Sequence, residues 1–361
     1  MSTTPKLIIE KLTVDSIEEF NRDDTLYIVD FRATGESLSH EIRSMFIYEN
    51  LSQWLCSTDT DIRKGVYAVN TKDIQRSDLT ASELVVAIPG SSPSRGIIDR
   101  ICEVPIGVSR IWAGIPHPAI DAYASSSNMT HNYRYVDFLK YNDKLQQKAV
   151  FGDMSPSFFK INTQQELDKA VAFSVGYIKS SIGAGGFNVL SVADQADKIK
   201  KKAAEIIDGD APWYYEQSVT GTPQSVQVYK KGDRYTIFGH AEQYIEGTNY
   251  VGAQLLDIYD MDAPLVTFLQ TACERINPFL STYEGFFGID IMVNGTEIYV
   301  LELNVRLTAT TIPTLVMNNT KKHEKVEYLE EIPLSATREN DTVLAKSADG
   351  EKLCVLRIAN A

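Results

Sequence analysis

Three polar residues in the last third of the chain alternate with apolar ones in a pattern that could hold a metal ion. In a strand, Glu302, Asn304 and Arg306 would share one face. Carboxylate and amide oxygens suit Mg²⁺, which takes one or two carboxylates together with substrate phosphates. Arg306 adds a rigid fork for phosphate or carboxylate oxygens. The pattern predicts a magnesium-nucleotide site; the plainer alternative is an edge hairpin with a solvated polar face.

A second carboxylate, Asp290, precedes this strand across the Asn294-Gly295 pair. Metal chelation requires Asp290 and Glu302 to share a face, as directly paired residues of an antiparallel ladder do. A two-residue turn at Asn294 and Gly295 would put the two carboxylates on opposite faces. We therefore expect a three-residue loop or a β-bulge between Asp290 and Glu302.

A glycine-rich loop lies upstream, and residues 177–190 have the pattern of strand, loop and strand. Glycines let backbone N–H groups approach phosphate oxygens, and Lys179 at the start of the loop adds a point charge. The segment lacks the Gly-Lys-Ser/Thr ending of a P-loop. A phosphate-binding loop and a flexible hairpin are both open at this point.

Four segments in this order resemble the ATP-grasp ligases. Asp143-Lys144 resembles the Asp-Lys that opens their ATP-binding domain, residues 177–190 their glycine loop, and residues 213–226 the hinge strand that meets adenine. Asp290 followed by Glu302-x-Asn304-x-Arg306 resembles their metal-binding end. The resemblance implies an α/β protein with an ATP-grasp fold and an α+β lid.

The resemblance also implies roles for individual residues. Asp290, Glu302 and Asn304 would be the metal ligands for two Mg²⁺ ions, with Mn²⁺ as a substitute. Lys179 and Arg306 would be catalytic, and Arg306 and His240 would meet the substrate, although a structural histidine is the plainer interpretation of His240. The implied ATP-binding residues are Lys144, Lys179, Ser181, Gly183, Gly185, Gly186, Glu216, Gln217, Val219 and Gln224. Pro223 stands where many relatives have a ribose-binding acid, which leaves Gln224 and Glu216 as candidates.

The chain divides into three predicted parts. Residues 1–125 form a Rossmann-like domain with buried parallel strands near 26–29, 66–69 and 84–88, residues 126–320 the ATP-grasp domain with a lid at about 151–215, and residues 321–361 a small C-terminal β-hairpin module. The first part resembles the divergent domain that precedes the ATP-binding domain in pheganomycin-type peptide ligases and some acyl-carrier-protein aminoacyl ligases.

Three helices have predicted starts. Thr163 and Glu166 form a capping box, Asp194 caps a helix that runs to Ile207, and Asp262 caps a third helix.

Composition is that of an ordinary globular enzyme. The 361 residues are 43% hydrophobic and 23% charged, and 48 acidic against 35 basic residues give a net charge of −13, which argues against nucleic acid or an anionic membrane as a partner. The widely spaced cysteines (Cys56, Cys102, Cys273 and Cys354) favour a reducing compartment. No apolar run has transmembrane length and no signal peptide is evident, so we expect the cytoplasm.

The resemblance implies an ATP- and Mg²⁺-dependent ligase. It would join a small-molecule carboxylate to an amine through an acyl phosphate, releasing ADP, in the biosynthesis of a small molecule or peptide natural product. One alternative loads an amino acid onto the thiol of an acyl carrier protein, for which Lys198, Lys200, Lys201 and Lys202 could be a dock rather than a solvated face. Another is a non-catalytic nucleotide-binding regulator. A homodimer remains open, and the sequence names neither acid nor amine.

Overall fold

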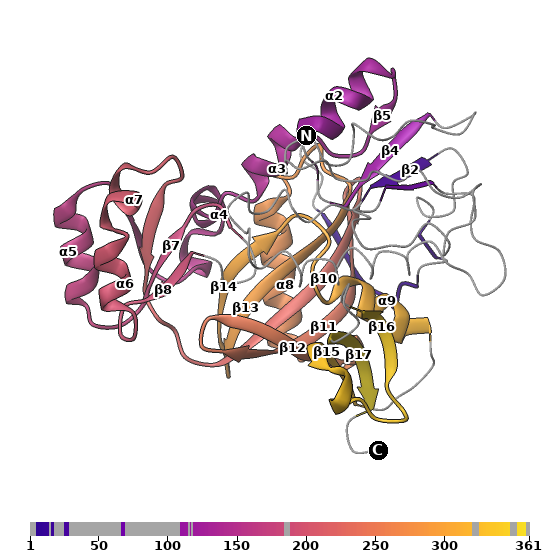
Figure 1. The fold of residues 1–361 in the computed structure, drawn as a ribbon. Helices are drawn as coiled ribbons and strands as arrows, with labels where there is room; N and C mark the ends of the chain where they lie inside the picture. The colour runs from indigo at the N-terminus through magenta and orange to yellow at the C-terminus, as the bar shows by residue number, and fades with distance from the viewer. Residues whose placement is uncertain are drawn as a thin grey trace.

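The structure is a computed structural model, and it describes residues 5–13, 16–17, 25–28, 66–68, 109–114, 116, 118–183, 188–319, 325–346 and 352–358. Strands in these residues form three sheets, and Figure 1 shows that the unit with α5, α6 and α7 lies apart from the large sheet. Among the described residues, no helix is long and apolar enough to cross a membrane.

The central sheet has the strand order β14-β13-β10-β11-β12-β15-β17-β16, and β1 pairs with β11. Its strands are β1 (Lys6–Ile9), β10 (Thr222–Lys231), β11 (Arg234–Glu246), β12 (Asn249–Leu256), β13 (Gly285–Asn294), β14 (Glu297–Asn304), β15 (Val326–Pro333), β16 (Thr342–Lys346) and β17 (Lys352–Ile358). The pairing of β1 is parallel and the others are antiparallel.

Strands near both ends of the chain pair with the central sheet. β1 belongs to the central sheet, although it lies in the predicted first domain. The predicted C-terminal hairpin exists as β16 and β17, but β15 joins it to β12, so these strands continue the central sheet instead of forming a separate module. Pairing between strands that are distant in the chain has no local sequence signature, which is why neither connection was predicted.

Helices cover the central sheet and its β14 edge. They are α3 (Tyr135–Tyr141), α4 (Lys144–Phe151), α8 (Ala263–Ile276) and α9 (Thr311–Asn319), with 3₁₀ turns at Gly152–Met154, Ile258–Asp260 and Leu334–Ala336, whereas α2 (Pro118–Ser126) contacts a different sheet near the N-terminus. The predicted cap of α8 is confirmed, because Asp262 Oδ1 accepts a hydrogen bond from Leu265 N at 2.9 Å. One apolar cluster runs through these helices and the sheet.

The lid has its own sheet, in the order β6-β9-β7-β8, and its own helices. Its elements are β6 (Phe158–Ile161), α5 (Gln164–Ala172), β7 (Tyr177–Ser180), β8 (Val189–Ser191), α6 (Ala196–Lys201), α7 (Ala203–Asp208) and β9 (Trp213–Glu216). The predicted cap of α5 is confirmed, since Thr163 Oγ1 accepts from Glu166 N, while Glu166 Oε2 accepts from the backbone of Asn162, one residue before the cap.

The second lid helix was predicted wrongly. It is two short helices, α6 and α7, that meet at Lys202. The carboxylate of Asp194 accepts from Ser191 Oγ at 2.6 Å and caps neither helix. A local bond from a serine hydroxyl competes with capping, and the sequence pattern did not separate the two.

A third sheet lies near the N-terminus, with the order β3 (Val66–Ala68), β2 (Thr25–Ile28), β4 (Arg110–Ala113) and β5 (Thr130–His131). All of its pairings are parallel, as predicted for residues 26–29 and 66–69. The predicted strand at 84–88 lies outside the described residues.

Candidate active site

The predicted carboxylate ladder is built by β13 and β14. Asn294 pairs with Glu297, so Gly295, with φ +60°, and Thr296 form a two-residue turn. Continuing that register would place Asp290 opposite Leu301 and turn Glu302 to the other face. A bulge shifts the register between Asp290 and Ile291 and puts Asp290 directly opposite Glu302. The predicted bulge is therefore confirmed.

Polar donors surround Asp290 on this face of the central sheet, which we call the metal face. Asn304 Nδ2 donates to Asp290 Oδ2 at 2.8 Å, and Gln243 Nε2 donates to Oδ1 at 3.2 Å. Burial, and then the charge of Glu302, raise the pKa of Asp290 to about 7. The negative charge of Glu302 thus disfavours ionisation of Asp290, and a bound cation would relieve this repulsion.

The residues of the metal face fit Mg²⁺. Asp290 and Glu302 offer carboxylate oxygens, and Asn304 offers an amide oxygen that here accepts from Arg306 Nη2 at 2.8 Å. The described residues contain no cluster of three or more His, Cys, Asp or Glu suited to a metal. Mg²⁺ usually keeps several waters and takes substrate phosphates, so two protein carboxylates are enough.

Arg306 is followed by a loop of threonines that Gln227 holds in place. Gln227 is fully buried on β10, and its Oε1 accepts from the hydroxyls of Thr308 and Thr311 at 2.7 and 2.9 Å. The loop lies close to β13, because a Cβ at Gly288 would come within 2.8 Å of Thr308 Cγ2. The position of Arg306 is thus set by a buried polar network that the sequence analysis missed.

Lys144 joins the lid to the metal face. Its Nζ donates to the carbonyl of Gly183 at 2.8 Å and lies 3.2 Å from Glu302 Oε1. Asp143 caps α4 by accepting from Leu145 N at 2.9 Å, which places Lys144 at the first turn of the helix. The backbone N–H of Lys144 also donates to Ser181 O at 2.9 Å. The helix start therefore lies between the glycine loop and the carboxylates.

Two buried lysines share one carboxylate on the lid. Glu216 of β9 is 1% exposed, and it forms ion pairs with Lys179 of β7 and, at 2.5 Å, with Lys148 of α4. Burial alone would raise the pKa of Glu216, but Lys179 and then Lys148 hold it below its ordinary value. Lys148 was not predicted. A lysine one helical turn after Lys144 lies on the same helix face, and this spacing was the available signal.

The edge of β14 is closed by side-chain amides. Gln147 accepts from Leu303 N at 2.9 Å and donates to Leu303 O at 2.5 Å. Asn142 accepts from Val305 N at 3.0 Å and donates to Val305 O at 3.4 Å. These two amides imitate a neighbouring strand, so α4 is attached to the strand that carries the metal ligands.

Two predicted residues lie on the opposite face of the sheet, and this is a correction. Ser225 is opposite Asp290, so its neighbour Gln224 points away from the metal face. His240 is opposite Val226, also on the far face, and its Nε2 lies 2.9 Å from Gln224 Oε1. Burial lowers the pKa of His240 to about 4. The structure therefore separates Gln224 and His240 from Asp290, Glu302 and Asn304, and their predicted ribose and substrate contacts stay predictions.

The remaining ATP-binding predictions fall in the lid and hinge. Ser181 is buried beside Lys144, and the carbonyl of Gly183 accepts a hydrogen bond from Lys144 Nζ. Gly185 and Gly186 lie outside the described residues. The backbone of Gln217 donates to Ser157 O at 2.8 Å, and Val219 follows in the segment between β9 and β10. Glu216 is buried in its two ion pairs, which argues against a ribose contact.

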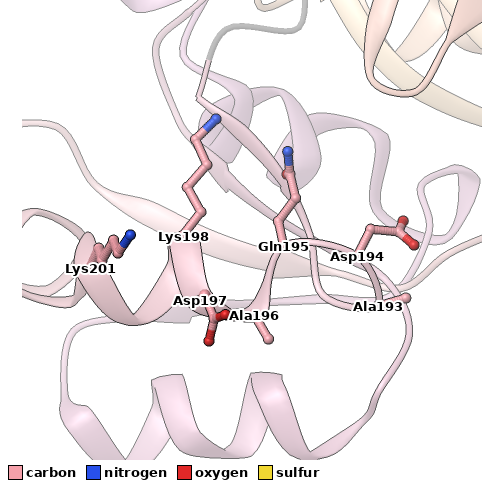
Figure 2. Close-up of a pocket in the computed structure, with 7 residues that line it drawn as sticks. All are labelled: Ala193, Asp194, Gln195, Ala196, Asp197, Lys198 and Lys201. Atoms are coloured by element: carbon pink, nitrogen blue, oxygen red, sulfur yellow. The ribbon is translucent and has the colours of Figure 1, made fainter.

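The lysines at positions 198–202 lie on a lid surface that also carries acidic side chains. Figure 2 shows Lys198 and Lys201 around a surface depression that Asp194 and Asp197 also line. Lys202 is engaged by Asn188 and Glu205, at 3.1 and 3.0 Å. The surface has mixed charge, which weakens the case for an acidic carrier protein as its partner.

Comparisons with known proteins agree with this geometry. Residues 140–310 match the model of an ATP-grasp domain family. A search of curated proteins finds no match.

Solved structures with the same fold include N5-carboxyaminoimidazole synthetase from Staphylococcus aureus complexed with ADP, at 12% identity and TM-score 0.61, covering 95% of this chain and 96% of that chain. Phosphoribosylamine–glycine ligase from Thermotoga maritima gives 12% identity and TM-score 0.61, with 93% of both chains covered. A putative ATP-grasp superfamily protein from Archaeoglobus fulgidus gives 13% identity and TM-score 0.58, with 93% and 99% covered.

The family model and the fold together indicate the class of protein. The chain carries an ATP-grasp domain over residues 140–310, and its fold is the ATP-grasp fold. The predicted class, an ATP-grasp enzyme, is therefore confirmed. The comparisons do not reach the pheganomycin-type or carrier-protein ligases to which the first domain was compared.

Proposed function

We propose that the protein is an ATP-dependent carboxylate–amine ligase that makes an amide or peptide bond and releases ADP and phosphate. The observation that carries the proposal is the bulged ladder, which puts Asp290, Glu302 and Asn304 on one face, with Lys144 bridging from Glu302 to the glycine loop. Carboxylates for a cation and lysines for phosphates then meet at one place, as phosphoryl transfer requires.

The proposed reaction has two steps. The substrate carboxylate attacks the γ-phosphorus of ATP, the bond to the β,γ-bridging oxygen breaks, and ADP leaves. The amine then attacks the acyl carbon, gives up a proton, and phosphate leaves with its bonding electrons. Mg²⁺, when bound, would cancel charge on the transferred phosphoryl group.

This chain's own residues bind and orient the reactants. Lys144 and Lys179 would contact the phosphates, and both are largely buried, where a fixed cation stabilises charge more strongly than in water. Arg306 would bind the γ-phosphate and acyl oxygens, held by its bonds to Asn304 Oδ1 and the carbonyl of Leu307. We propose two Mg²⁺ ions, for which Mn²⁺ could substitute. A homodimer is part of the same proposal.

Trapping the acyl phosphate tests the proposal directly. Purified protein is incubated with ATP, Mg²⁺ and a pool of amino acids and small carboxylic acids, and ADP and product masses are measured. Hydroxylamine added to the same mixture should give a hydroxamate of the donor acid. Glu302→Gln, which keeps the shape of the side chain, is the matched control and should lose both signals. ATP consumption that gives AMP, or none with any acid, would contradict the proposal.

The same experiment separates two other candidates. An enzyme that loads a carrier protein would show product mass on a carrier thiol and none with free amines; the exposed Lys198, Lys200 and Lys201 are the observation in its favour. A regulator would bind ATP without turnover. Biosynthesis of a natural product is the pathway class we propose for the ligase, and the product masses would show whether it is correct.

A further inference from the structure

Lys148 has no role in the proposed reaction, yet it is among the most buried charged side chains described. It is 2% exposed, and its Nζ lies 2.5 Å from Glu216 Oε2. The same ammonium group donates to the carbonyls of Leu301 at 3.1 Å and Val300 at 3.4 Å. These two residues lie at the bulge that sets Glu302 opposite Asp290.

The three contacts fix Lys148 where it is. Its side chain comes from α4, its carbonyl partners from β14 and its carboxylate partner from the lid strand β9. Lys179, the second cation on Glu216, differs because 15% of its side chain is exposed against 2% for Lys148. Of the two lysines, Lys179 is therefore the one whose ammonium group a ligand could reach.

Sharing one carboxylate creates a competition. When an N–H of the Lys179 ammonium group donates to a phosphate, the ion pair between Lys179 and Glu216 becomes weaker. A buried carboxylate left without a cation is strongly unfavourable. With Lys148 in place, Glu216 keeps a cation when Lys179 turns away. Without Lys148, Glu216 would retain Lys179 and oppose nucleotide binding.

We propose that Lys148 is a positioning residue that neutralises Glu216 so that Lys179 can leave that carboxylate and bind the phosphates of ATP. The inference rests on the proposed function, since it takes Lys179 as a phosphate ligand. The inference adds a third lysine to the site. It also gives a role to the buried Glu216, which would hold Lys179 near the glycine loop through their ion pair while no nucleotide is bound.

Direct binding tests this inference without any knowledge of the acid or amine. The Kd of the β,γ-imido analogue of ATP with Mg²⁺ is measured by titration calorimetry. Lys148→Met keeps the length of the side chain and removes its charge, and should raise Kd by about ten- to a hundredfold, as expected when one of two cations on a buried carboxylate is lost. Lys169→Met, at an exposed lysine of α5, is the matched control and should leave Kd unchanged.

The double variant Lys148→Met/Glu216→Gln distinguishes positioning from a structural role. Removing the carboxylate frees Lys179, so its Kd should return to within about threefold of wild type. If Lys148 acted only by holding the bulge through Leu301 and Val300, the double variant would bind as weakly as the single variant. That result, or an unchanged Kd in Lys148→Met, overturns the inference. Should Lys148→Met fail to fold, the double variant decides alone, by the same criterion.

The two proposals fail in different ways. Wild-type protein that binds the analogue but never turns over ATP would remove the ligase and leave the role of Lys148 intact, provided that the variants behave as described. Wild-type protein that does not bind the analogue removes both. A ligase whose Lys148→Met variant has unchanged Kd removes the role of Lys148 alone.

Discussion

The central sheet and the lid hold their active-site residues by different means. The carboxylates of β13 and β14 lie on a sheet whose strands and helices share one continuous apolar cluster. The lid has a separate and smaller cluster between its sheet and α5 to α7, and it meets α4 through Lys148, Lys144 and their acceptors. Figure 1 shows the two units on either side of α4. Apolar burial is insensitive to a ligand, whereas ion pairs can exchange for phosphate, so the lid is the part suited to respond to nucleotide.

The largest expected effect is on the lid's cation. Lys179→Ala should lower kcat by about 10²- to 10³-fold while the fold stays intact, because a preorganised charge at the transferred phosphoryl group is lost. Lys169→Ala is the matched control. It removes an exposed lid lysine that stacks on the ring of Phe159, and kcat should not change. Steady-state ADP release measures both. Equal rates for Lys179→Ala and wild type would remove the glycine loop from the site.

Cavities made in the two clusters should separate the units. Leu269→Ala in α8 opens the core under the central sheet, and Leu167→Ala in α5 opens the lid core. Each should cost about 2–5 kcal/mol locally. We expect Leu269→Ala to lower the main unfolding transition, and Leu167→Ala to raise hydrogen exchange in residues 158–216 while leaving that transition in place. A single transition lowered equally by both would show that the lid and the sheet unfold as one unit.

Without a bound cation, the folded protein should be less stable with an ionised Asp290 than with a neutral side chain at that position. The pKa of Asp290 is raised from 3.8 to about 7, so between these values the folded protein holds a proton that the unfolded chain has released. Stability then falls as pH rises from about 4 to about 7. With EDTA at pH 8, the free energy of unfolding of Asp290→Asn should therefore exceed that of wild type by roughly 1–3 kcal/mol after allowance for screening, and its unfolding temperature should be higher. At pH 4 both differences should vanish.

Magnesium provides the control for this pH dependence. Adding Mg²⁺ at pH 8 should raise the unfolding temperature of wild type and leave that of Asp290→Asn unchanged, since only ionised Asp290 is a good ligand. Thermal unfolding followed by circular dichroism at both pH values measures the effect. A variant that is less stable than wild type at pH 8 would mean that Asp290 acts chiefly through its bonds to Asn304 and Gln243.

Features that depend on residues close together in the sequence could be predicted, whereas features that depend on distant residues could not. The period of two in β14 and the need for parity predicted the bulge, and local capping predicted the starts of α5 and α8. The orientation of Gln224 could not be predicted in this way, because it follows from the pairing of Ser225 with Asp290, which joins two strands that are distant in the chain.

For other residues, the local sequence does not show which partners they bind. Lys148 looks like an ordinary helix lysine, and its importance depends on a carboxylate 68 residues later and on carbonyls more than 150 residues later. Gln147 and Asn142 are likewise polar residues whose partners lie on a distant strand. Burial of a charged or amide side chain, which marks these residues in the structure, is decided by tertiary packing alone.

The smallest expected effect compares two helix caps, one in each unit. Asp262 accepts from Leu265 N at 2.9 Å at the start of α8, and Thr163 accepts from Glu166 N at 3.2 Å at the start of α5. Replacing either by alanine should cost about 1 kcal/mol, since one helix N–H loses its acceptor. Asp262→Ala should lower the main unfolding temperature by about 2–4 °C. Thr163→Ala should instead speed hydrogen exchange in α5 and leave that temperature unchanged, because the lid's stability is separate. If Thr163→Ala lowers the main transition as much as Asp262→Ala does, the ion pairs at α4 bind the lid to the sheet more firmly than its separate core suggests.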